Sequence, residues 1–156
     1  MATELGLSIL SFAGMRLAFP LTETVSIRRS SELVENHAMP LACGSVVHAE
    51  RRWPVFRLNA NFEPLLGSLQ QNSYCVCLSA DDGQTGLVLA CDATNLFKWT
   101  TEDMLPIPLP TCMQREVTPI QQLIQQGTQL LPVSSAPVLA AYLRSLMNSP
   151  MEKNNE

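Results

Sequence analysis

The sequence has few charged residues. Asp, Glu, Lys and Arg make up 15% of its 156 residues, against about 25% in a typical soluble domain. A surface with fewer charges than usual is less hydrophilic, so this composition indicates apolar surface that is kept for a partner. The formal net charge of −4 argues against general binding to nucleic acids.

The sequence also lacks a segment suited to crossing a membrane. The stretch 117–143 has no charged residue, but it contains five glutamines and three prolines, which a membrane helix would not tolerate. Glu4 stands where a secretory signal needs Lys or Arg, and Arg16 interrupts the apolar run that follows. Five cysteines, an odd number, fit a reducing compartment. We therefore expect a cytoplasmic protein without direct membrane insertion.

Motifs for catalysis and metal binding are missing as well. There is no phosphate-binding loop, no Gly-x-Ser-x-Gly and no His-Glu-x-x-His. Cys75 and Cys77 would point to the same face of a strand, but zinc sites usually have four ligands and a wider Cys spacing. The remaining candidates, His37, His48 and Cys91, form no second pair. We expect no metal and no cofactor.

A nucleophilic pair of Cys43 and His48 is the best enzymatic candidate. Such a pair needs an activated thiolate and a third group that orients the base. Nothing in the sequence marks either feature, so we predict that the protein is not an enzyme and has no catalytic residues. A thiol hydrolase acting through Cys43 stays as a minor alternative.

Residues 44–58 contain two apolar, β-prone runs around the charged centre Glu50-Arg51-Arg52. This pattern predicts a strand, a turn and a second strand. Proline cannot donate a hydrogen bond to a neighbouring strand, so the second strand should lie at an edge at Pro54 or begin just after it.

Similar β-prone runs recur along the chain. They lie at 7–12, 15–19, 24–27, 74–78, 85–90 and 93–99. Ala13-Gly14 should turn the first hairpin, and residues 80–84 should form a tight polar link. One helical turn is expected at 30–35, and Thr100 resembles the cap of another short helix. About nine short strands with one real helix predict a sandwich or barrel.

The C-terminal third has one ambiguous segment and one clear helix. Residues 119–133 fit a helix by apolar spacing, but the many short strands favour a hairpin that turns at Gln126-Gly127, and we predict the hairpin. Ser134 or Ser135 can cap a helix that carries Pro137 in its first turn. The apolar face of this helix would be formed by Leu139, Tyr142, Leu143 and Leu146.

The order of these elements resembles that of CheW-like chemotaxis coupling proteins. Residues 10–21 resemble the family's opening hairpin, and Val25 and Ile27 match the element that follows it. The spacing from Gly44 through Pro54 to Leu58 fits the family core of a glycine, an Arg-Gly pair and a proline followed by apolar residues. The segments at 86–89 and 100–106 and Gly127 also match in order, so the similarity covers about residues 7–146.

The resemblance implies a mainly β fold with two small, intertwined, five-stranded SH3-like β-barrels and a C-terminal α-helix. Residues 1–150 would be a single CheW-like domain of two barrel subdomains, and 151–156 a disordered polar tail. Family members have no catalytic activity. They couple chemoreceptors to a histidine kinase, whose regulatory domain has the same fold. By resemblance, the receptor's helical tip would lie between the barrels near Leu33, Val46 and Val88.

The chain departs from the family pattern at positions associated with partners. The family's Arg-Gly pair falls on Ala49-Glu50, an acidic or amide position falls on Arg57, and a strand-closing Asp falls on Ala90. The apolar spacing that specifies the fold is kept. We therefore expect a divergent adaptor, serving a pilus-type or alternative chemosensory pathway, with altered partner contacts at Ala49 and Glu50.

One further alternative uses the basic residues. Five of the ten basic residues lie in the stretch 28–57, and four of them, Arg28, Arg29, Arg51 and Arg52, could make a nucleic-acid-binding β-barrel. The net charge favours a solvated protein face instead, so no nucleic acid is expected as a partner. The expected partners are a histidine kinase regulatory domain and the helical tip of a chemoreceptor.

Overall fold

A computed structural model describes residues 4–34, 41–66, 73–79, 86–100, 105–107, 109, 118–126 and 128–147. The strands are β1 (Glu4–Phe12), β2 (Met15–Pro20), β3 (Thr24–Arg29), β4 (Gly44–His48), β5 (Arg51–Phe56), β6 (Tyr74–Ser79), β7 (Gly86–Cys91), β8 (Ala93–Thr100), β9 (Leu105–Ile107), β10 (Gln122–Gln126) and β11 (Gln129–Val133). The helices are α1 (Ala136–Met147) and two 3-10 turns, η1 (Leu21–Glu23) and η2 (Ser30–Glu32).

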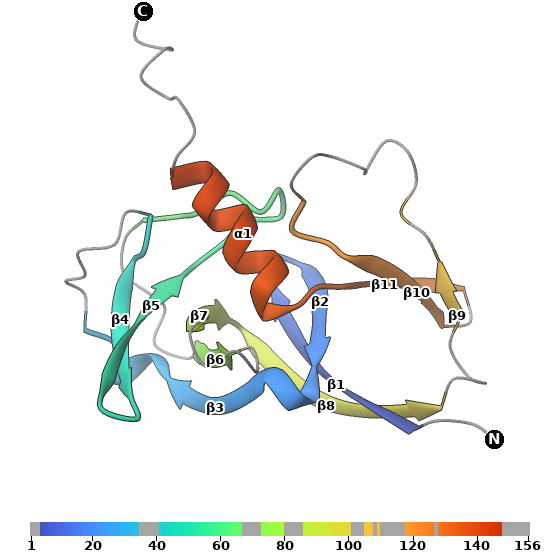
Figure 1. Cartoon of the computed structure of the whole chain (residues 1–156), viewed down its shortest axis with the longest axis horizontal. Coiled ribbons are helices and arrows are strands. Elements are labelled where there is room, and N and C mark those ends of the chain that lie inside the picture. The colour runs from blue at the N-terminus through green and yellow to red at the C-terminus, as the bar shows by residue number, and fades with distance from the viewer. Residues whose placement is uncertain are drawn as a thin grey trace, which may run out of the picture.

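The strands form two sheets, with α1 lying across them (Figure 1). The first sheet has the order β8-β1-β2-β11-β10-β9, and the second has the order β3-β6-β7-β5-β4. All strands of the second sheet lie between β2 and β8 in the sequence, so it is an insertion into the first. The predicted fold class, mainly β with two small β units and a C-terminal helix, is confirmed. The short β9 gives the first sheet a sixth strand, which the prediction did not include.

The second sheet closes on itself through the segment that follows β3. Val34 and Ser45 of β4 exchange two backbone hydrogen bonds, of 2.8 Å from Val34 N and 2.7 Å from Ser45 N. Since β3 and β4 are the outer strands of this sheet, the exchange joins its two edges. We call this unit the second barrel, and we call the line where β3 and residues 33–34 meet β4 the seam.

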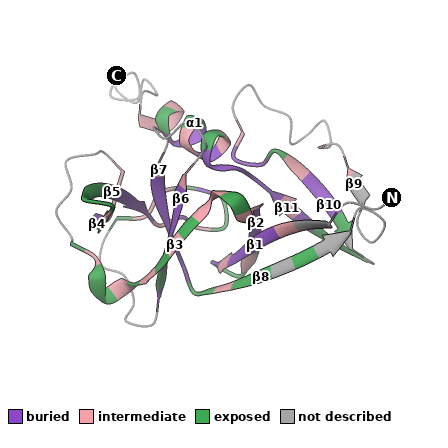
Figure 2. Cartoon of the chain, turned by 60° about the horizontal axis from the view of Figure 1, so that its bottom comes forward, coloured by how far each residue is buried: buried purple, intermediate pink, exposed green. Residues whose placement is uncertain are grey.

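A shared core holds the two sheets and the helix together. Its members come from both sheets, from α1 and from the loop after β5, and the largest fully buried ones are Leu10, Leu17, Phe19, Phe56, Leu58, Leu78, Leu89, Leu139 and Leu143. A smaller cluster fills the first sheet, and a third fills the second barrel. Figure 2 shows buried residues along β5, β6 and β7, whereas β3 and β8 carry many exposed ones.

The C-terminal helix begins where the sequence predicts. The Ser135 Oγ accepts a hydrogen bond of 3.3 Å from Val138 N, which identifies Ser135 as the cap. Glu23 of η1 adds a second cap, because its Oε1 accepts a 2.7 Å hydrogen bond from Ala136 N. The helix buries Leu139, Tyr142 and Leu143 as expected.

The ambiguous segment is a hairpin. β10 and β11 pair antiparallel from Gln122↔Val133 to Gln126↔Gln129, so the hairpin prediction is confirmed and the helical alternative is wrong. The expectation for Pro54 is wrong, because β5 begins at Arg51 and lies between β7 and β4. The proline is tolerated because the pairing of β5 with β7 begins only at Val55. Thr100 is the last residue of β8, and 101–104, 80–84 and 151–156 lie outside the described residues.

Candidate functional site

The structure places three of the predicted partner-binding residues in one cluster. Val46, Val88 and the partly buried Leu33 pack together inside the second barrel. The side chains of Val46 and Val88 are 1% and 0% exposed, so they support the barrel wall from within. A partner could meet Val47, which alternates with Val46 on β4, whereas the residues that alternate with Val88 on β7 are buried as well.

The exposed residues near the seam were missed by the sequence analysis. On β3, Val25 and Ile27 face outward and are exposed, whereas Thr24, Ser26 and Arg28 are half-buried. Val47 on β4 is 53% exposed, and Val34 is exposed beside it. Because Val34 pairs with Ser45, Val34 and Val47 are diagonal neighbours on the outer face of the seam. The alternation of strand residues was visible in the sequence, but it does not say which face is inside.

The other two predicted residues, Ala49 and Glu50, form the tight turn between β4 and β5. Both are exposed, and both have positive φ, 52° and 65°. This is the type I′ arrangement that suits a two-residue hairpin, for which Asn and Gly are preferred. The turn therefore holds two side chains in a left-handed backbone region that L-residues avoid. Ala49 and Glu50 thus project from a strained but fixed tip.

Replacing Glu50 by Gly is expected to stabilise the protein. Glycine removes the Cβ contact at positive φ but adds freedom to the unfolded chain, so the net gain should be about 0.5–1 kcal/mol. Chemical unfolding measures the gain. Glu50→Gln is the control, because it removes the charge and leaves the backbone strain. Equal stabilities of Glu50→Gly and Glu50→Gln would contradict the strained turn.

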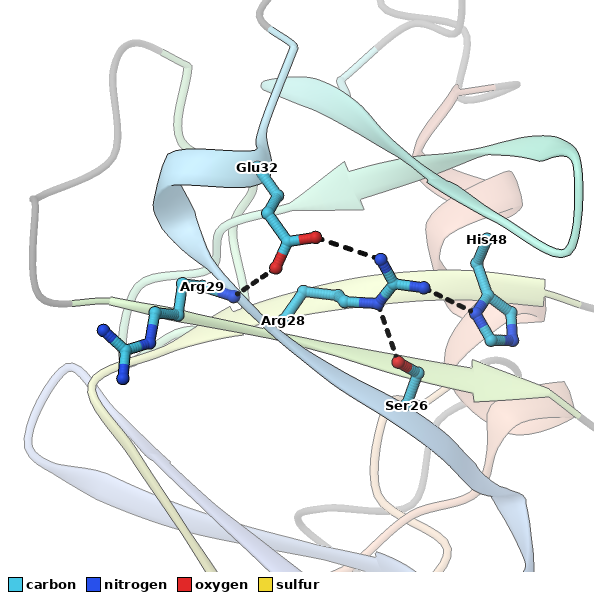
Figure 3. A network of polar contacts seen from close by, with 5 residues as sticks. All are labelled: Ser26, Arg28, Arg29, Glu32 and His48. Carbon is cyan, nitrogen blue, oxygen red and sulfur yellow. Dashed lines mark hydrogen bonds and ion pairs between the residues drawn. The ribbon is translucent and has the colours of Figure 1, made fainter.

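Arg28 joins the two sides of the seam from the inside (Figure 3). Its Nε donates to Ser26 Oγ at 2.8 Å, its Nη1 to Glu32 Oε1 at 3.0 Å, and its Nη2 to His48 Nδ1 at 3.1 Å. Glu32 also accepts a bond from Arg29 N at 3.3 Å. The hydrogen bond from Arg28 is the main reason why the pKa of Glu32 is lowered. Arg28 is therefore committed to the seam, which weakens the alternative that it binds nucleic acid.

His48 is held in place by Trp53. The two rings meet edge to face, with centroids 5.1 Å apart and planes at 88°, and the indole Nε1 donates to the His48 backbone oxygen at 3.1 Å. Trp53 pairs with Val46 across the hairpin and covers the interior cluster. The His48 ring therefore lies between the hairpin and the Arg28 guanidinium.

The seam carries a local excess of positive charge. Residues 24–34 and 44–52 contain four arginines and two glutamates, which gives a formal charge of +2. Since the whole chain has a formal charge of −4, the remainder carries −6. Arg29, Arg51 and Arg52 are exposed, and Arg52 is the register partner of Val47. The outer seam is thus an apolar surface with basic neighbours.

The four thiols in the described part of the chain are poor nucleophiles. Burial raises the pKa of Cys75 and of Cys91 to about 12 and that of Cys77 to about 11, and it also raises the pKa of Cys43. They are protonated at neutral pH and behave as small apolar residues. In the described part of the chain, no hydrogen bond joins Cys43 to His48, and no group of three His, Cys, Asp or Glu residues could hold a metal.

A cleft of about 300 Å³ lies where the tip of the first hairpin meets the ends of β5 and β7. Phe12, Leu58 and Leu65 form much of its apolar wall, and Arg57 and Asp92 are its charged members. Its one thiol, Cys91, is protonated at neutral pH, as described above. Cys91 therefore supplies no activated nucleophile to the cleft.

The fold and the seam define a protein of two packed β units, closed by a C-terminal helix, with an exposed apolar and basic surface on one unit. Among solved structures it resembles the crystal structure of the scaffolding protein TtCheW from Thermoanaerobacter tengcongensis. The TM-score is 0.65 at 12% sequence identity, and the match covers 85% of this chain and 90% of that one. The chain therefore has a CheW-like fold.

The sequence comparisons are negative. No protein-family model matches the chain, and no curated protein matches it by sequence. Within the described residues, no helix is both long and apolar enough to cross a membrane. The likeness in structure therefore stands without a detectable likeness in sequence.

Proposed function

We propose that this protein is a cytoplasmic, non-catalytic adaptor that couples a chemoreceptor to a histidine kinase in a chemotaxis or pilus-type chemosensory pathway. The outer seam of the second barrel is the observation that carries the proposal. Eight large apolar side chains are exposed in the described residues; Val34 and Val47 are neighbours at the seam, and Val25 and Ile27 lie on the outward face of β3, one of the two strands that the seam joins. An apolar surface of this kind on a CheW-like fold is suited to accept the side of a helix.

The predicted partner-binding residues take different roles in this proposal. Val46, Val88 and Leu33 hold the barrel wall in shape from inside, and the exposed neighbours Val47 and Val34 make the contact. Ala49 and Glu50 add a fixed, exposed tip at one end of the seam. Glu50 occupies part of the position at which the related family has its Arg-Gly pair, so the contact at the tip has a different charge here.

The basic neighbours of the seam indicate the chemistry of the partner. Arg51 and Arg52 sit directly after the turn, and Arg52 is opposite Val47 in the hairpin register. A receptor helix with an apolar stripe flanked by acidic residues would complement this surface, because opposite charges speed association and fix orientation. The kinase regulatory domain is the second partner that the proposal assigns.

A binding experiment with matched variants tests the proposal. Val47→Asp places a charge in the apolar seam and is expected to weaken binding of the receptor's helical tip at least about tenfold. Leu130→Asp is the control, because Leu130 is equally exposed, at 54% against 53%, but lies on β11 of the first sheet. Its affinity should stay within about twofold of the wild type.

The measurement is a titration of each protein variant against the labelled receptor tip and, in a separate experiment, against the labelled kinase regulatory domain. Binding is followed by calorimetry or fluorescence anisotropy. Adaptor contacts are small and weak individually, so concentrations up to the high micromolar range are needed. The proposal fails if the wild type binds neither partner at that concentration, or if Val47→Asp and Leu130→Asp change the affinities equally.

A further inference from the structure

We infer that Arg28 and His48 form a pH-sensitive latch that holds the seam of the second barrel closed while His48 is neutral and releases it when His48 is protonated. The inference does not depend on the proposed partners, because it concerns the closure of the barrel itself. It rests on the contact between β3 and β4 shown in Figure 3.

The direction of the hydrogen bond makes the latch sensitive to protonation. A guanidinium is only a donor, so the 3.1 Å contact between Arg28 Nη2 and His48 Nδ1 requires an unprotonated Nδ1 that accepts. A proton on Nδ1 occupies the same electron pair. It would replace the hydrogen bond by two facing N–H groups and would bring two positive charges into contact. The closed seam therefore requires that Nδ1 of the His48 imidazole carries no proton.

The Trp53 ring packs edge to face against the His48 ring, and its indole Nε1 donates to the backbone oxygen of His48. On the other side, Arg28 is fixed by Ser26 and by Glu32. A protonated His48 that keeps its contact with Trp53 would therefore move away from Arg28 together with the β4–β5 hairpin that carries both residues.

The surrounding charges do not cancel the repulsion. From β5, Arg51 is the register partner of His48 and adds a further positive charge. From η2, Glu32 is negative but is already paired with Arg28. From the turn, Glu50 is the remaining acidic group of the hairpin, and it is exposed to solvent, where screening weakens its effect. The direct contact with Arg28 thus dominates.

The seam is also held closed by the two backbone hydrogen bonds between Val34 and Ser45. They form a single bridge outside the named strands, so this bridge depends on the side chains that hold β3 near β4. When the latch opens, this bridge should open with it. The amides of Val34 and Ser45 then become reporters of the latch, and the apolar seam residue Val47 changes its position relative to Val25 and Ile27.

Hydrogen exchange on the full chain tests the latch. The protection of the Val34 and Ser45 amides, relative to an unstructured chain at the same pH, is measured at about pH 7.5 and about pH 5.5, across the range in which imidazoles change charge. In the wild type, protection should fall by about tenfold on acidification, the effect of losing one charge-assisted hydrogen bond. In His48→Gln, whose amide oxygen can accept from Arg28 at both pH values, protection should not change.

Two further variants make the result decisive. His37→Gln removes the only other histidine and should keep the acid-dependent loss of the wild type. Arg28→Gln removes the facing positive charge, so it should abolish the loss even if His48→Gln does not fold. The inference is overturned if the wild type keeps full protection at the lower pH, or if the loss persists in the folded His48→Gln or Arg28→Gln variant.

Discussion

Replacing Phe56 by Ala is expected to lower the free energy of unfolding by about 4 kcal/mol, because burial is lost and a cavity remains. The Phe56 side chain is 2% exposed and belongs to the core that both sheets share with α1. It lies at the end of β5, next to Leu89 of β7 in the register. Removing it should weaken both units at once, so we expect unfolding to remain a single transition.

Chemical denaturation followed by circular dichroism and by tryptophan fluorescence measures this. Val47→Ala is the control: it also shortens a β-strand residue, but Val47 is exposed, so the change should be within about 0.5 kcal/mol. A Phe56→Ala protein that loses less than about 1 kcal/mol, or that unfolds in two separate steps, would contradict a common core and a single CheW-like domain.

Replacing Gly44 by Ala is expected to lower the free energy of unfolding by about 3 kcal/mol, at the upper end of what overpacking a tight site costs. A Cβ at this position would lie 2.6 Å from the backbone oxygen of Val34 and 2.8 Å from Leu33 Cδ1. The leucine side chain can rotate, but the oxygen is fixed by its hydrogen bond from Ser45 N. The added methyl group should therefore push residues 33–34 away from β4 and open the seam.

Gly14→Asn is the matched control for this experiment. Gly14 has a positive φ of 78° and no heavy atom within 4 Å of its ideal Cβ position, and Asn tolerates that backbone conformation better than other residues do. Its effect should be below about 1 kcal/mol. Equal stabilities of Gly44→Ala and the wild type would show that the seam is looser than the structure indicates.

The local elements could be predicted because their signals are local. The hairpins follow from β-prone runs around two-residue links, such as Ala13-Gly14, and α1 follows from Ser135 and Pro137 at its start. The hairpin at 122–133 was harder, since its own residues favour a helix. The segment forms a hairpin because, as a strand, β10 pairs with β11 on one side and with β9 on the other.

The candidate site could be predicted only in part, because it depends on pairings between distant residues. Val46 and Val47 are both valines in the same strand, and only the register with Trp53 shows that Val46 is inside. The contact between Arg28 and His48 crosses from one edge of the sheet to the other. No spacing in the sequence marks it, so Arg28 first looked like a member of a basic patch.

The most direct test of the account is to map the binding surface by amide chemical shifts while the receptor's helical tip is added to the isotope-labelled chain. We predict that the largest changes occur on β3, residues 33–34, β4 and the Ala49-Glu50 turn, with little change at Leu130 on β11. Changes centred on the first sheet or on the cleft at Arg57 and Asp92, with a silent seam, would contradict the account.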